Sequence, residues 1–107
     1  MSHIMSGHKT ETLSLTASST TSEALDFREY SHGTIANESG GALTITYYAQ
    51  MGPGGTALAL EDEDNVAVTQ TLGDDEVCAL PSACAGASFL VLVLSTGTAE
   101  VTVHCKR

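Results

Sequence analysis

The sequence contains no tryptophan, and only five of its 107 residues are aromatic. Large side chains contribute most to hydrophobic stabilisation, about 1.5–3 kcal/mol for each one that is fully buried. A core built from this sequence is therefore thin, and the chain is long enough for one domain only. Burial between subunits would compensate for a thin core, so we expect a homo-oligomer.

Positive charge is also scarce, because four Lys and Arg residues stand against 13 Asp and Glu residues and the formal net charge is −9. A surface of this sign repels phosphates and releases no counterions, which excludes nucleic acid as a partner. An anionic membrane surface is disfavoured for the same reason, and no apolar run approaches the roughly 18 residues of a membrane-spanning helix. The acidity favours solubility and leaves cationic partners open.

The three cysteines, Cys78, Cys84 and Cys105, form an odd set without the spacing of a disulfide scaffold. Residues 1–10 are polar and lack the apolar segment of a signal peptide, so we expect free thiols in a reducing compartment. Two arrangements fit the sequence: buried structural thiols, or one Cys78–Cys84 bridge. The glycosylation pattern at residues 37–39 is interpreted as a chance match.

Apolar residues alternate with polar ones along most of the chain and nowhere recur at helical spacing over three turns. Alternation of this kind predicts strands with one buried face. Turn residues separate the strands at roughly ten-residue intervals, which predicts an all-β antiparallel sandwich or jelly roll of eight to nine short strands. The predicted strands span residues 11–17, 25–30, 33–37, 42–50, 56–60, 66–72, 77–80, 88–94 and 99–105.

Residues 1–10 are expected to form an N-terminal arm, followed by a single sandwich domain at residues 11–107. In the predicted strand at 56–60, Leu58 and Leu60 are expected to point inward. The small-residue segment at 81–87 is interpreted as a loop that holds one helical turn.

One strand breaks the alternation, because residues 89–94 are all apolar. Successive side chains on a strand point to opposite faces, so both faces of this strand are apolar. A sandwich strand needs only one apolar face, since the other normally meets water. We therefore expect a second subunit to cover the other face. The two faces carry Phe89, Val91 and Val93, and Leu90, Leu92 and Leu94.

Three polar residues are further candidates for intermolecular contacts. Arg28 lies between Asp26 and Glu29, and its guanidinium pairs well with carboxylates. It forms either a structural ion pair within the chain or an ion pair between subunits. His3 and His8 belong to the predicted arm and are candidates for a contact with an acidic neighbour.

No arrangement of residues predicts catalysis, a cofactor or a metal. Cys105 is adjacent to His104, but neighbouring strand residues face opposite sides and cannot form a nucleophile–base pair. No glycine-rich loop leads into a helix, so a phosphate cradle is absent. The carboxylates at residues 61–65 lack EF-hand spacing and are interpreted as a solvated hairpin turn, with a divalent-cation site as the alternative. We expect no enzymatic activity.

A series of segments follows one another in a characteristic order: Ala24–Tyr30, Gly33–Ile35, Thr44–Ala49, Gly55–Leu60, the acidic turn, Val66–Thr71, Leu80-Pro81 and Gly86-Ala87. In this order the sequence resembles small β-sandwich proteins encoded by tailed phages and prophages. The similar region runs from about Ser22 to Val103. At Asp64-Asn65 an Asp-Gly turn would be more usual, but Asn tolerates positive φ, so we expect the hairpin to be kept.

This resemblance implies a non-enzymatic virion protein that is assembled in the bacterial cytoplasm. It favours a capsid decoration or cement protein, with the major capsid protein as its partner and a homotrimer as its oligomeric state. Two other functions remain open: a subunit of a tail, fibre or baseplate, and a carbohydrate-binding or adhesin module. No catalytic residues follow from the resemblance.

Overall fold

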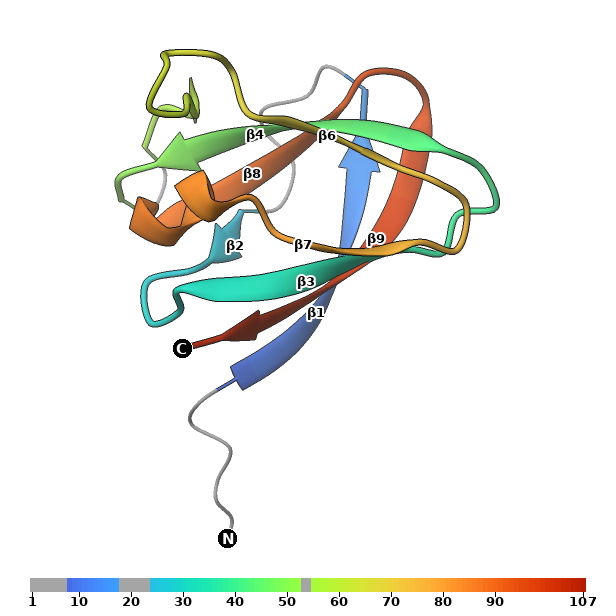
Figure 1. The fold of residues 1–107 in the computed structure, drawn as a ribbon, viewed down its shortest axis with the longest axis horizontal. Helices are drawn as coiled ribbons and strands as arrows, with labels where there is room; N and C mark the ends of the chain where they lie inside the picture. The colour runs from blue at the N-terminus through green and yellow to red at the C-terminus, as the bar shows by residue number, and fades with distance from the viewer. Residues whose placement is uncertain (1–7, 18–23, 53–54) are drawn as a thin grey trace, which may run out of the picture.

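The computed structural model describes residues 8–17, 24–52 and 55–107. It is all-β, with two antiparallel sheets packed face to face, which confirms the predicted sandwich (Figure 1). No helix in the described ranges is long and apolar enough to cross a membrane. The elements are β1 (His8–Thr16), β2 (Leu25–Asp26), β3 (His32–Asn37), β4 (Leu43–Gln50), β5 (Leu58–Ala59), β6 (Thr69–Leu72), β7 (Val77–Ala79), the 3-10 helix η1 (Ser82–Gly86), β8 (Phe89–Leu94) and β9 (Thr98–Lys106).

One sheet has the strand order β1-β9-β3-β7, and the other has the order β2-β8-β4-β5, with β6 also paired to β4. The two sheets meet at one corner, where Ala17 follows β1 and forms a parallel bridge with Leu94 of β8. Strand β1 begins at His8 and pairs with β9 from its first residue. The strand thus begins three residues earlier than the alternating pattern from Glu11 predicted.

The core is built from every second residue of each strand, the residues whose side chains point inward, as the period-two pattern predicted. In β1 these are Leu13 and Leu15, each 1% exposed. The core lies between the two sheets, so the outer faces of β1, β9 and β3 are left to polar side chains. The other central side chains with under 2% exposure include Ile35, Ile45, Tyr47, Leu72, Leu90, Leu92, Val101 and Val103.

The chain between β4 and β7 differs from the prediction. Strands β5 and β6 lie one after the other along the same edge of β4, opposite residues 48–49 and 43–46. Between them the chain leaves the sheet as a hairpin, closed at its base by the hydrogen bond from the Val68 N–H to the Leu60 carbonyl (2.9 Å). Leu58 is 63% exposed, so the prediction that it points into the core is wrong. It lies on an edge strand of two residues, which the core does not cover.

The expectation for β8 is also wrong, because the chain itself covers both faces of this strand. Strand β8 lies between β2 and β4 inside the five-stranded sheet. On the outer face, Arg28 lies over the Phe89 ring, and Tyr48 is the cross-strand neighbour of Val91. A second subunit is therefore not needed to bury this strand, and its side chains offer no contact surface. No side chain of the set is more than 8% exposed: Phe89, Leu90, Val91, Leu92, Val93 and Leu94.

Candidate docking surfaces

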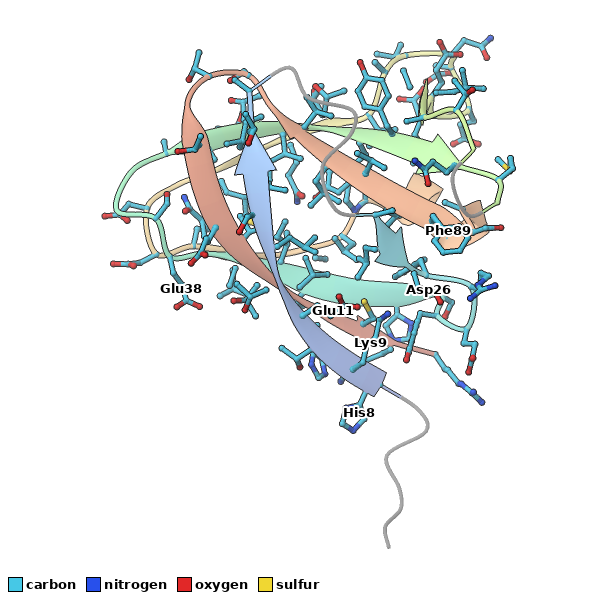
Figure 2. All side chains as sticks on the ribbon, turned by 180° about the vertical axis from the view of Figure 1, so that it is seen from behind. His8, Lys9, Glu11, Asp26, Glu38 and Phe89 are labelled. Carbon is cyan, nitrogen blue, oxygen red and sulfur yellow. The ribbon has the colours of Figure 1, made fainter. Side chains whose placement is uncertain are left out.

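Three histidines and a lysine meet on the outer face of the four-stranded sheet. Lys106 of β9 lies between His8 of β1 and His32 of β3 in the strand register, and His104 lies in the next outward-facing row. Cross-strand partners share a face of the sheet. Cys105, which lies between His104 and Lys106 in β9, is buried, so His104 and Lys106 point outward. We call His8, His32, His104 and Lys106 the basic patch; His8 is labelled at the start of β1 in Figure 2.

Neighbouring hydroxyl groups hold two of these imidazoles. The Thr10 hydroxyl is hydrogen-bonded to Nδ1 of His104 (2.6 Å), and the Ser31 hydroxyl to Nδ1 of His32 (3.0 Å). A hydroxyl that donates to Nδ1 leaves the Nε2–H of a neutral imidazole as a donor for an outside acceptor. The rings of His8 and His104 lie 5.3 Å apart. A depression of about 240 Å³ is lined by His32, Gly33, Thr34, His104 and Lys106.

The basic patch lies at the end of the sandwich that carries all the Lys and Arg residues. Three of these cations are paired with carboxylates, whereas Lys106 forms no ion pair with a described residue. The patch therefore presents one ammonium group that has no ion-pair partner among the described residues, together with three imidazole rings. The three pairs are Lys9–Glu11 (2.8 Å), Arg28–Asp26 (2.8 Å) and Arg107–Glu29 (2.9 Å).

A second charged surface is the hairpin between β5 and β6, and we call residues 61–67 the acidic hairpin. The Asp62 carboxylate holds its turn, because Oδ1 accepts from the backbone N–H groups of Asp64 (2.8 Å) and Val66 (3.1 Å). Asn65 has φ 61°, which confirms that Asn supplies the positive φ of this turn. The carboxylates of Glu61, Glu63 and Asp64 are exposed and form no ion pair with a described residue.

This geometry confirms the interpretation of residues 61–65 as a solvated hairpin turn. In the described part of the chain, no three His, Cys, Asp or Glu side chains are grouped so that they could hold a metal ion. The turn at residues 73–76 is closed similarly, by a hydrogen bond from the Gly73 N–H to the Glu76 carboxylate (2.6 Å).

The other predicted site residues have separate positions. Arg28 forms a structural ion pair with Asp26 within the chain, the first of its two predicted roles. His8 is part of β1 rather than of an arm. His3 lies outside the described residues. His104 and Cys105 face opposite sides of β9, as predicted, because only Cys105 is buried.

The cysteines are free, and no Cys78–Cys84 bridge is formed. Cys84 and Cys105 are buried, and Cys78 is half-buried. Burial raises the pKa of the Cys84 thiol to about 12, so this side chain is a thiol rather than a nucleophilic thiolate at neutral pH. The prediction of structural thiols is confirmed for Cys84 and Cys105.

Sequence reasoning missed the role of Asn37, a polar side chain with 0% exposure. Its amide group donates to the carbonyls of Gly41 (2.7 Å) and Gly73 (2.9 Å), and its carbonyl accepts from the Ser39 hydroxyl (2.7 Å). Asn37 thus joins the turns that follow β3 and β6. The alternation that places Ile35 in the core also places Asn37 there, and this was the available signal.

All five aromatic residues lie in the described part of the chain, and none of their side chains is fully exposed. Phe27, Tyr47 and Phe89 are buried, and Tyr30 and Tyr48 are half-buried. The Tyr47 hydroxyl donates to Oε1 of Gln70 (2.6 Å).

No protein-family model matches the chain, and no curated protein matches it. The fold is similar to the crystal structure of the SPBc2 prophage-derived protein YomS, with a TM-score of 0.51 and 16% sequence identity. The similarity covers 99% of this chain and 100% of that chain. The likeness is one of fold alone.

Proposed function

We propose that the chain is a non-enzymatic structural protein of a phage or prophage particle, and in particular a decoration protein on the outer surface of the head. The observation that carries the proposal is the end-to-end likeness in fold to a prophage-derived protein. Because the likeness covers 99% of this chain and 100% of that chain, the proposal concerns the sandwich as a whole.

The burial pattern supports a role as a preformed building block. Strand β8 is covered on both sides within one chain, so the protomer can fold before it binds. A decoration protein has to add to a finished surface as a folded unit. Its contacts then come from exposed polar surfaces such as the basic patch, rather than from a shared core.

The proposal is tested on particles from the strain that carries the gene. Wild-type and gene-deletion particles are purified, separated into heads and tails, and examined by mass spectrometry. We expect the protein in the head fraction, and we expect purified protein to bind deletion-strain heads and increase their resistance to heat. Bovine serum albumin at the same concentration is the control for non-specific retention.

Each outcome of this experiment decides a different level of the proposal. Recovery in the tail fraction would overturn the decoration role and identify a tail or baseplate subunit. Absence from both fractions would overturn the virion role altogether. Binding of the isolated protein to a glycan array, with no binding to heads, would favour the adhesin module.

A further inference from the structure

The charges of this protein are separated in space. The end of the sandwich that holds the start of β1 and the end of β9 carries all four Lys and Arg residues, and three of them are ion-paired with Glu11, Asp26 and Glu29. The remaining described carboxylates have no cationic partner. In Figure 2, Glu38 lies on the opposite side of the molecule from Asp26, with His8 and Lys9 at the lower end of β1. The lysines and arginines therefore gather in one region, whereas the unpaired carboxylates lie on other parts of the surface, although the net charge of the molecule is strongly negative.

We propose that copies of this chain associate head to tail, with the acidic hairpin of one protomer bound to the basic patch of the next. The two surfaces are chemically complementary. Lys106 has only donors and His32 offers a ring N–H, whereas the carboxylates of Glu61, Glu63 and Asp64 are acceptors. Hydrogen bonds between such charged groups are among the strongest that proteins form.

The patch is also wide enough for the hairpin. The row His8–Lys106–His32 spans three adjacent strands, about 10 Å at the usual strand spacing, whereas the two strands of a hairpin lie about 5 Å apart. The acidic hairpin stands out from the sheet because the chain leaves the edge of β4 between residues 60 and 68. It can therefore reach a neighbouring molecule without disturbing either sheet.

A second copy fits the patch better than a polyanion does. A second copy also carries a net charge of −9 and is repelled at long range. At the contact, however, its hairpin brings only a few carboxylates, whereas a nucleic acid brings a phosphate charge with every nucleotide along its whole length. The contact joins two different surfaces, so it is heterologous and produces a ring when it closes or a filament when it does not. It is small and weak by itself, but many such contacts add up when copies sit side by side on a lattice.

The association is measured by sedimentation equilibrium at low ionic strength, up to several hundred micromolar protein. The patch variant carries His32→Glu and Lys106→Glu, and the hairpin variant carries Glu63→Lys and Asp64→Lys. Asp62 and Asn65 are kept because they form the turn. We expect each variant alone to associate at least about tenfold more weakly than the wild type, and an equimolar mixture of the two to regain association.

The control variant carries Glu38→Lys and Asp74→Lys, which changes the net charge by the same amount as the hairpin variant. It should associate at least as well as the wild type, because general repulsion falls while the contact is kept. A wild type that stays monomeric, a mixture that does not regain association, or a hairpin variant that associates as strongly as the control would each overturn the proposal. A single Lys106→Glu variant repeats the test if a double variant does not fold. A monomeric wild type would leave the virion role standing, because that role is tested on particles.

Discussion

The guanidinium carbon of Arg28 lies 4.8 Å from the centre of the Phe89 ring. The same guanidinium donates from Nε (3.0 Å) and from a terminal nitrogen (2.8 Å) to the two carboxylate oxygens of Asp26. A planar fork of donors can bind a carboxylate at its edge and stack on a ring with its face. Arg28 thereby covers the outer side of β8 at Phe89 and is already engaged within its own chain.

The first prediction concerns the charge of Asp26. Hydrogen bonds from Arg28 lower the pKa of this carboxyl group to about 2. Because its pKa is lower in the folded state than in the unfolded chain, the stabilisation is complete above about pH 4 and is lost as the pH falls to about 2. In the Arg28→Ala variant we expect the midpoint of the Asp26 titration, followed by carbon-13 NMR, to rise to near 4. Arg107→Ala is the control, and an equal rise there would show that the effect is not local.

The second prediction concerns the buried amide of Asn37. Its side chain makes five hydrogen bonds to Ser39 and to the carbonyls of Gly41, Leu72 and Gly73. Asn37→Ala would leave buried carbonyls without donors, so we expect the free energy of unfolding to fall by about 2–4 kcal/mol in urea titrations. Ser39→Ala, which removes one of these bonds, should cost about 1 kcal/mol or less. Equal costs for the two variants would contradict a central role for the amide.

The third prediction tests the turn of the acidic hairpin. Asn65 has φ 61°, a conformation that a β-branched residue adopts only with strain. Asn65→Val should lower stability by about 1–2 kcal/mol. Asn65→Gly should change stability by less than about 1 kcal/mol, because glycine adopts this conformation freely. Thermal unfolding of both variants measures the difference, and a harmless valine would contradict the geometry of the turn.

The fourth prediction separates buried from exposed leucines. Leu92 is 0% exposed and Leu58 is 63% exposed. Leu92→Ala should lower the free energy of unfolding by about 2–5 kcal/mol, because it leaves a cavity in the core. Leu58→Ala should change it by about 0.5 kcal/mol or less. A large loss in the Leu58→Ala variant, dependent on protein concentration in thermal unfolding, would indicate instead that an interface covers this residue.

Most of the strands could be predicted from local patterns. The alternation around Leu13, Ile45 and Val101 predicted core-facing residues that the structure confirms, because a period of two is a property of the strand itself. The solvated turn at residues 61–65 was also predicted, but the arrangement of the strands around it was not. Strands β5 and β6 are shorter than the predicted strands at 56–60 and 66–72, because residues 61–67 leave the edge of β4 and carry their side chains into water.

The basic patch could not be predicted because it depends on the register between distant strands. The spacing of His8, His32 and His104 in the sequence matches no known ligand pattern. These residues come together because β9 lies between β1 and β3, where Lys106 pairs with both His8 and His32. For β8, in contrast, the sequence led to a wrong expectation, namely that a second subunit covers one face of the strand. An apolar run on both faces indicates only that both faces are covered, and it does not say whether the cover comes from the same chain or from another.

The sequence by itself determined the class of fold and the net charge, because residue alternation and charge are local properties that no partner can change. The tertiary structure alone decided which surfaces are free, where the charges gather, and that the chain buries its own most apolar strand. These depend on which strands lie side by side, and strand pairing is set by packing of the whole chain rather than by any one segment.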